Sequence, residues 1–231
     1  MIQLTRRGVV INGSTADLRG LRAQFHRDHY AILPKLIEPD LLATIVDHIE
    51  SAPQIHKEFD GIIRESVIDD PLIYNLFLFL LEAPEFQRLV QRITGCRRIA
   101  RFQGRIYMLN PSTEEQIVWH TDVTDHRMVT LSLNLTRQEY RGGTLQMRYR
   151  NSNEILHEIR NTGLGDALIM RVSKNLAHRV LPVEGDVPRT GLAGWFRWEK
   201  ENVNLHQAWR EASKVTKKET AEKESSGLTA G

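Results

Sequence analysis

The sequence predicts a mainly β protein with helices in its N-terminal part, an α+β fold whose β portion forms a sandwich or a jelly-roll barrel. Two patterns along the chain predict this. Before residue 99, apolar residues recur at helical spacing. From Ile99 onward, short runs of β-branched and apolar residues alternate with Gly, Asn, Asp and Pro, which is typical of short strands joined by turns. With 231 residues, the chain is long enough for one domain with its own core.

The N-terminal part, residues 1–98, is expected to form helices and a little strand that pack on the β core. The polar stretch Ser14–Asp17 can cap a short helix, because such side chains accept hydrogen bonds from free backbone N–H groups. Pro39 is placed where a second helix can begin. A longer helix or helix pair is expected from about residue 71 to about residue 94, ended by Gly95. We interpret this part as support for the core.

The β portion, residues 99–212, is expected to form the functional core and a single domain with the preceding part. Eight strands are predicted in it: Arg101–Leu109, Ile117–His120, Met128–Leu135, Gly143–Tyr149, Glu154–Ile159, Ala167–Val172, Ala177–Val183 and Thr190–Trp198. The last stretch, residues 213–231, is charged, polar and almost free of large apolar residues. We expect it to be a disordered tail.

Composition and charge argue against several classes of function. The chain has 31 basic and 29 acidic residues, interspersed, so a nucleic-acid-binding face is not expected. Cys96 is the single cysteine, which excludes an internal disulfide and fits a reducing compartment. The apolar run Leu72–Leu81 is too short to span a membrane, and the first ten residues lack a signal-peptide pattern. We expect a cytoplasmic protein without nucleic-acid or membrane partners; the oligomeric state is not indicated.

One short stretch stands out as a candidate metal site. His120 and Asp122 are two residues apart, so on a β-strand their side chains would leave from the same face. His178 is the best candidate for a third ligand. Two imidazoles and one carboxylate, with coordination positions left open, form the facial triad of non-haem Fe(II) oxygenases. Arg189 follows 11 residues later, where a cation can hold the carboxylate of a co-substrate.

The other histidines are interpreted separately, because the chain has nine of them. A single histidine on a strand is more often structural than metal-binding. We expect His157 to be exposed. No ligand spacing connects the rest, which we expect to be structural or surface residues: His26, His29, His48, His56 and His206.

Six sequence motifs follow one another over roughly residues 100–200. They are His120-Thr121-Asp122, Arg127–Leu135, Gly142–Leu145, Gly165–Met170, His178–Gly185 and Arg189–Leu192. Their order and spacing resemble the Fe(II)/2-oxoglutarate-dependent dioxygenase superfamily, and within it the prolyl-hydroxylase-like branch. The resemblance implies a double-stranded β-helix core that uses Fe(II), 2-oxoglutarate and O₂, with His120, Asp122 and His178 as the metal ligands.

The resemblance also implies a pocket for 2-oxoglutarate. Arg189 is expected to bind the far carboxylate, because a planar guanidinium can grip a carboxylate with two hydrogen bonds. Tyr107 is expected to contribute a phenol to the same carboxylate. Asn134 shares strand parity with Thr130 and Ser132, and a polar face inside a barrel needs a hydrogen-bonding partner. Bound 2-oxoglutarate is the partner that we expect for Asn134.

Four residues near these motifs are candidates for substrate contact: Arg127, His126, Trp195 and Arg105. Each also has a plainer interpretation. Arg127 is at least as well explained by a structural ion pair, His126 by a loop beside the site and Trp195 by core packing. Arg105 shares strand parity with Tyr107 and either faces an acidic substrate or covers a solvated face.

The sequence therefore predicts a hydroxylase that converts 2-oxoglutarate to succinate and CO₂ while oxidising an unactivated C–H bond. The resemblance implies a small molecule (an amino acid or a natural-product intermediate) or a protein side chain such as proline as substrate. Desaturation, ring closure or demethylation would use the same residues, whereas the carboxylate of Asp122 argues against halogenation. Two alternatives stay open: a zinc hydrolase, which needs no anchor such as Arg189, and a non-catalytic jelly-roll module that binds metal or ligand.

Overall fold

The computed structural model of the chain describes residues 2–198, apart from 60, 112–114, 125 and 161. The predicted tail over 213–231, and residues 199–212 of the predicted core, lie outside the described residues. The described residues all belong to one structural unit.

The predicted helices are confirmed, and the long one is a pair. They are α1 (Thr15–Asp28), α2 (Pro39–Ser51), α3 (Pro71–Leu81) and α4 (Pro84–Thr94). Ser14 and Asp17 form a capping box at the start of α1, each side chain accepting from the other's backbone N–H. Pro84 cannot continue α3 and begins α4 instead. Gly95 ends α4 with φ +71°, a left-handed conformation that glycine adopts without strain.

Eleven strands of the described part form one antiparallel sheet. In chain order they are β3 (Tyr30–Leu33), β4 (Gln54–Phe59), β5 (Ile63–Ile68), β6 (Arg101–Leu109), β7 (Gln116–His120), β8 (Arg127–Asn134), β10 (Leu145–Tyr149), β11 (Ile155–Ile159), β12 (Ala167–Arg171), β13 (Leu176–Val180) and β15 (Arg189–Arg197). Their order is β11-β10-β13-β7-β5-β6-β15-β8-β12-β3, with β4 paired to β5. Two small two-stranded sheets pair β1 (Ile2–Thr5) with β2 (Gly8–Ile11) and β9 (Arg141–Gly142) with β14 (Val183–Glu184).

All eight strands predicted after residue 99 are present, within a few residues of the predicted bounds. The mainly β fold class with N-terminal helices is confirmed. The N-terminal part contains more strand than predicted, namely β1, β2, β4 and β5. Every residue of β4 is exposed, so the alternation of apolar and polar residues that reveals a half-buried strand is absent there. Strands β3 and β5 pair with core strands, so both parts of the chain contribute to one sheet.

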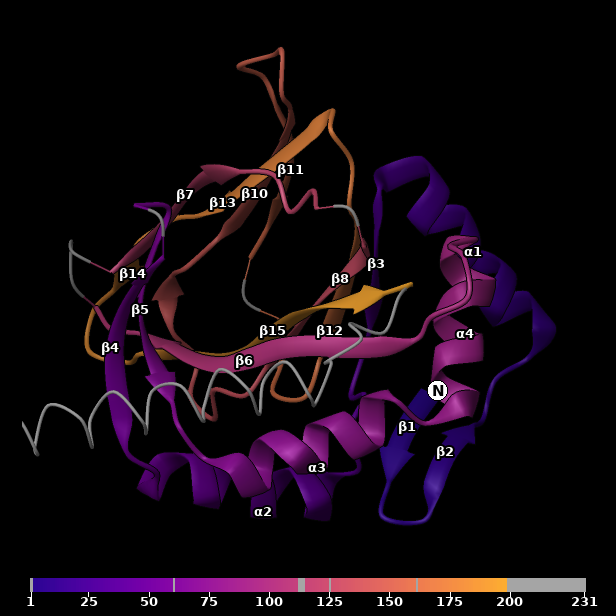
Figure 1. The fold of residues 1–231 in the computed structure, drawn as a ribbon, viewed down its shortest axis with the longest axis horizontal. Coiled ribbons are helices and arrows are strands. Elements are labelled where there is room, and N and C mark those ends of the chain that lie inside the picture. The colour runs from indigo at the N-terminus through magenta and orange to yellow at the C-terminus, as the bar shows by residue number, and fades with distance from the viewer. Residues whose placement is uncertain (1, 60, 112–114, 125, 161, 199–231) are drawn as a thin grey trace, which may run out of the picture. The chain divides into compact units, whose positions relative to one another are not determined.

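Two hydrophobic cores lie on the two sides of this sheet. On the outer side, the helices pack on β6, β15, β8, β12 and β3; α2 and α3 run along this side in Figure 1. Phe86 of α4 contacts Phe196 of β15, which in turn contacts Phe102 of β6, with ring centroids 6.1 and 5.2 Å apart. The smaller core fills the inside of the curled sheet and joins side chains from strands far apart in the strand order: Tyr107, Leu109, Ile117, Leu145, Met147, Ile159, Leu168, Met170, Val180 and Val183.

None of the four helices in the described part of the chain combines the length and the apolar character that a membrane-spanning segment needs.

Candidate active site

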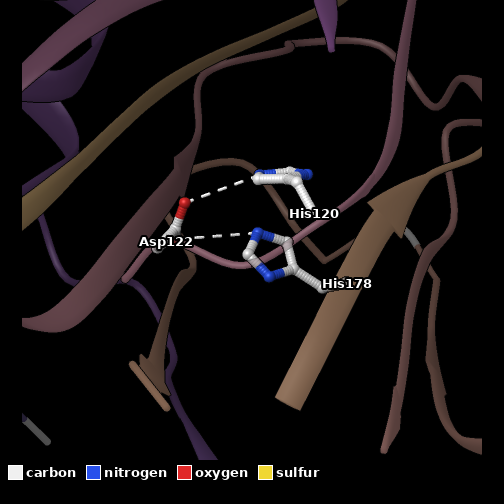
Figure 2. Close-up of side chains that lie close together, drawn as sticks. All are labelled: His120, Asp122 and His178. Carbon is white, nitrogen blue, oxygen red and sulfur yellow. Dashed lines mark ion pairs between the residues drawn. The ribbon is translucent and has the colours of Figure 1, made fainter. Parts of the chain in front are cut away.

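His120, Asp122 and His178 come together inside the curled sheet (Figure 2). His178 of β13 pairs directly with His120 at the end of β7. Their imidazole ring centroids are 4.3 Å apart with an interplanar angle of 55°. Asp122 Oδ1 lies 3.5 Å from His120 Nε2, and Asp122 Oδ2 lies 3.6 Å from His178 Nε2. One carboxylate thus faces two imidazole nitrogens.

The prediction that His120 and Asp122 share a strand face is wrong in its geometry. Strand β7 ends at His120, and Asp122 lies in the following loop. Its side chain is held instead by Thr130 of β8, whose hydroxyl donates to Asp122 Oδ2 at 2.7 Å. Since β8 lies far from β7 in the strand order, this bond crosses the interior of the curled sheet. The carboxylate still converges with both imidazoles, through a contact that sequence spacing does not reveal.

A β-bulge in β7 directs His120 into the interior. His178 pairs with His120, whereas Val180 pairs with Ile117, so two residues of β7 oppose one residue of β13. In a regular strand, residues three apart face opposite sides of the sheet. The bulge resets this alternation. As a result Ile117 packs in the inner core and His120 also faces the site.

The charges of the three side chains are closely coupled. Burial by itself would raise the pKa of Asp122, but hydrogen bonding with His120 and the charge of His178 outweigh it. Trp195 and Thr130 act in the same direction, so the pKa of this carboxyl lies well below its usual range. Burial lowers the pKa of His178 to about 4, so its imidazole is neutral at pH 7. A neutral imidazole and an ionised carboxylate are the protonation states that bind metal.

The donor set fits an Fe(II) ion. The ligand atoms of the three residues lie within 4.8 Å of one another, and they offer two nitrogens and one oxygen. His120 Nδ1 lies 2.8 Å from Val118 O, so Nδ1–H donates to this carbonyl and Nε2, which faces Asp122, is the nitrogen that a metal would take. Metal-binding histidines commonly donate their second ring N–H in this way. Orientation and tautomer are therefore set by the protein itself. Burial lowers the pKa of His120, but its hydrogen bonds to Asp122 and Val118 outweigh burial and raise it, so metal binding would displace a proton from Nε2.

Arg189 lies in a small pocket that is bordered by β8, β12 and β15. The pocket lining includes Asn134, Tyr140 and Gly143. Arg189 donates to the carbonyl oxygen of Gly143 at 2.8 Å. Burial lowers the pKa of Arg189, and the phenols of Tyr107 and Tyr140 raise it by more, so the guanidinium remains charged. A cation flanked by two phenols can bind a carboxylate.

Tyr107 lies where the sequence places it, next to Arg189. It is 2% exposed and pairs with Gly191 of β15, and a Cβ built on Gly191 would be 3.3 Å from the Tyr107 hydroxyl oxygen. Tyr140 was not predicted. It follows β8 in a loop, without strand parity to mark it. The Tyr140 ring and Arg189 both pack closely against Gly143, which has no side chain to keep them away. A Cβ at this position would be 2.9 Å from the Tyr140 ring and 3.2 Å from Arg189 Cδ.

Asn134 lines the same pocket, but its amide is already used. The amide nitrogen donates to Thr162 O at 2.5 Å, and the amide oxygen accepts from the backbone N–H of Thr136 at 3.1 Å. The first bond connects the end of β8 to the loop before β12, and the second stabilises the turn that follows β8. The prediction that 2-oxoglutarate satisfies Asn134 stays untested, and within the protein the residue already has partners.

Of the candidates for substrate contact, Arg127 and Trp195 lie together near Asp122. Arg127 stacks on Trp195, with the guanidinium carbon 3.3 Å from the indole ring centroid. The buried indole N–H of Trp195 makes no hydrogen bond of regular geometry, yet it lies close enough to Asp122 to help lower the pKa of that carboxyl. Arg105 forms an ion pair with the fully buried Glu65.

Two further histidines lie outside the triad. His126 packs against Trp198, with ring centroids 5.2 Å apart, and its carbonyl accepts from the Trp198 backbone N–H. The structure therefore does not bring its ring together with the triad. His157 was expected to be exposed, which is wrong. It is half-buried on β11 and contacts the ring of Tyr30 edge-on at 5.2 Å.

Comparison with known proteins agrees with this geometry. A family model described as the 2OG-Fe(II) oxygenase superfamily matches residues 103–197, which include the triad and Arg189. None of the curated proteins matches the sequence. Several solved structures share the fold. A Pseudomonas putida prolyl-4-hydroxylase superposes with TM-score 0.61 at 18% identity, covering 79% of this chain and 100% of that chain.

Two further solved structures superpose with slightly lower TM-scores. A 2OG-Fe(II) oxygenase family oxidoreductase from Burkholderia pseudomallei gives TM-score 0.58 at 16% identity, covering 87% of this chain and 97% of its own. A Trichoplax adhaerens prolyl hydroxylase, solved with a hypoxia inducible factor peptide fragment, gives 0.58 at 15% identity, with 80% and 94% covered. At these identities the likeness shows the fold alone.

Proposed function

We propose that this chain is a 2OG-Fe(II) oxygenase, as the family model that matches residues 103–197 supports, and that it hydroxylates an unactivated C–H bond of its substrate. As a member of the family it is a dioxygenase that uses Fe(II), 2-oxoglutarate and O₂. The proposal assigns the metal to His120, Asp122 and His178. It assigns the far carboxylate of 2-oxoglutarate to Arg189. The observation that carries it is the convergence of two imidazoles, of which that of His178 is neutral at pH 7, with an ionised carboxylate beside the Arg189 pocket.

When bound, Fe(II) would activate O₂, which is the oxidant, and 2-oxoglutarate would supply two of the four electrons that reduce it. One O₂ converts 2-oxoglutarate and the substrate R–H into succinate, CO₂ and R–OH, which balances all atoms and electrons. The chain's residues prepare this reaction. Thr130 and His120 orient the Asp122 carboxylate, and the Val118 carbonyl fixes the His120 tautomer. Preorganised ligands reduce the reorganisation that metal binding and reaction would otherwise require.

The far end of the co-substrate meets a site built for a dicarboxylic acid. Arg189 supplies a permanent positive charge, which raises the affinity for a carboxylate in a pocket shielded from water. The hydroxyl groups of Tyr107 and Tyr140 can each donate one hydrogen bond to that carboxylate. A zinc hydrolase has no use for such an anchor, and a binding module that has lost its chemistry has no need to keep both the anchor and the triad.

The substrate is part of the proposal. The similar structures include two prolyl hydroxylases, one solved with a peptide, and also the epimerase SnoN from nogalamycin biosynthesis, at TM-score 0.58 and 12% identity. Enzymes that share this fold therefore differ in substrate and in outcome. We propose either a small molecule (an amino acid or a natural-product intermediate) or a protein side chain such as proline, with hydroxylation as the outcome.

An anaerobic titration tests the proposed co-substrate site. Fe(II) and then 2-oxoglutarate are added to the full chain, and the visible absorption is recorded. A weak charge-transfer band that needs both additions is the expected result. The band should be lost in His178→Ala and retained in His157→Ala, which alters a histidine outside the triad. A folded protein that gives no band with Fe(II) and 2-oxoglutarate together would refute the assignment.

A further inference from the structure

Arg127 differs from the other arginines of the site in its partners. Arg105 is paired with Glu65, and Arg189 donates to the Gly143 carbonyl. Arg127 is half-buried, yet within the described residues no hydrogen bond or ion pair joins its side chain to another side chain or to the backbone. Its single close interaction there is the stack on Trp195. A half-buried cation that has no hydrogen-bonded or ion-paired acceptor is costly unless a ligand supplies one.

The stack leaves Arg127 prepared for such a ligand. The flat face of the guanidinium is covered by the indole ring at 3.3 Å from the centroid, so the group is held in one plane. Its N–H groups point along the edges of that plane and are not among the buried polar atoms that lack a partner, so they are accessible. An edge with parallel N–H groups matches a carboxylate, which accepts two hydrogen bonds at once.

The position of Arg127 places a bound anion next to the reaction. Trp195 contacts both partners: its ring stacks on Arg127, and its indole N–H lies close to the Asp122 carboxylate. Asp122 does not neutralise Arg127, because no ion pair joins them and both carboxylate oxygens already face Thr130 and the imidazoles. Burial lowers the pKa of Arg127, the charge of Asp122 opposes this, and Arg197 and Arg105 lower the pKa further, so the attraction of Asp122 only partly offsets the cost of this buried charge.

We propose that the substrate presents a carboxylate near the C–H bond that is oxidised, and that Arg127 binds this carboxylate through a bidentate hydrogen-bonded pair. The inference rests on the proposed function for the oxidation itself, and it adds the chemical class of the substrate. A carboxylate can come from a free acid or from an acidic side chain in a peptide. Both present the same group to Arg127, and the experiment separates them.

The test measures binding without turnover. The full chain is loaded with Fe(II) and 2-oxoglutarate under anaerobic conditions, and dissociation constants are measured by ligand-observed NMR. The probes are the free L-amino acids, the matching L-amino acid amides, and acetylated, amidated pentapeptides with a central Glu or Gln. Each pair differs in one negative charge. The same panel is repeated on the metal-free chain, because Arg127 is not among the proposed metal ligands.

The expected result is that at least one carboxylate binds about 10- to 100-fold more tightly than its neutral partner, as the loss of a charge-assisted hydrogen bond predicts. Arg127→Gln should remove this preference, and Arg127→Lys should keep part of it. The matched control is Arg148→Gln, since Arg148 stacks on Trp119 at 4.2 Å but lies on β10 with its own partner, Asn153. The control should leave the preference unchanged.

Preference among the free acids would identify a small-molecule substrate, and preference for the Glu peptide would identify an acidic peptide. A panel in which no carboxylate binds more tightly than its neutral partner would overturn the proposal, whether or not the variants fold. A preference that survives in folded Arg127→Gln would also overturn it. If Fe(II) and 2-oxoglutarate fail to bind while the metal-free chain still prefers carboxylates in an Arg127-dependent way, the proposed function fails and Arg127 remains a carboxylate-binding site without the oxidation.

Discussion

Arg189 and Arg127 lie on neighbouring strands, β15 and β8, at opposite ends of the strand pair. Arg127 pairs with Arg197, the last residue of β15, whereas Arg189 begins that strand eight residues earlier, about 26 Å along an extended strand. Arg189 is enclosed with two phenols and a carbonyl partner. Arg127 rests on an indole face and has accessible N–H groups. The enclosed end suits one fixed co-substrate, and the open end suits a substrate that enters and leaves.

The largest effect is expected from a substitution in the triad, which the enclosed and the open end share. Asp122→Ala takes away the carboxylate between the two imidazoles. Formation of succinate should fall by more than the roughly 100-fold that loss of an outer-shell partner can cause. The measurement is 2-oxoglutarate-dependent succinate formation, with Asp47→Ala on the exposed face of α2 as control. Appreciable turnover in Asp122→Ala would remove this residue from the metal site.

The next effect should be confined to the enclosed end. Arg189→Ala removes the cation that faces the far carboxylate, so the concentration of 2-oxoglutarate needed for half-maximal response should rise about 10- to 100-fold. Affinity for a carboxylate probe at the Arg127 end should not change. Titration of both ligands on the same variant measures this. Equal weakening of both would show that the two ends do not act separately.

A smaller effect is expected from the bond that crosses the interior. Thr130→Val is close in shape and removes the hydroxyl that donates to Asp122 at 2.7 Å. Fe(II) affinity should fall about tenfold, as for loss of an outer-shell partner. Competition with a metal-ion indicator measures it. Thr44→Val, which alters an exposed hydroxyl on α2, is the control; an Fe(II) affinity in Thr130→Val equal to wild type would contradict the expected role.

The smallest effect on 2-oxoglutarate affinity is expected from removing one phenol hydroxyl at the enclosed end, and it distinguishes the roles of Tyr107 and Tyr140. Tyr140→Phe should weaken 2-oxoglutarate binding about two- to tenfold, the range for one neutral hydrogen bond. Tyr107→Phe should have a similar effect, because both phenols act on Arg189. Titration of the charge-transfer band with 2-oxoglutarate gives the affinity directly. If Tyr107→Phe weakens binding and Tyr140→Phe does not, Tyr140 only encloses the pocket.

The strands and helices of the core were predictable because their patterns are local. Period-two runs bounded by turns located the strands after residue 99, and caps, prolines and Gly95 located the helices. The exposed strand β4 was not predicted because it has no buried apolar face. It is a strand because it pairs with β5, which the local sequence pattern does not show. Long-range pairing carries no signature within a short window of sequence.

The convergence of His120, Asp122 and His178 was predictable from residue type and order, whereas its geometry was not. Asp122 lies beyond its strand and is held by Thr130, which is eight residues away in sequence and on another strand. Tyr140 reaches Arg189 from a loop, where no periodicity applies. The half-buried state of His157 depends on its contact with Tyr30 from the other part of the chain. In each case a contact across the sheet interior, or between strands far apart in sequence, decided the outcome.

The bulge in β7 has a consequence for the evolution of chain length. Val118 and Trp119 together oppose one residue of β13, so the strand contains one residue more than its partner requires. Loss of either residue would leave Ile117 and His120 two positions apart, and a regular ladder would still direct both inward. In an alignment of homologous sequences, a one-residue gap at Val118 or Trp119 is therefore compatible with a histidine that occupies the same place as His120. Such a gap does not mark a divergent site.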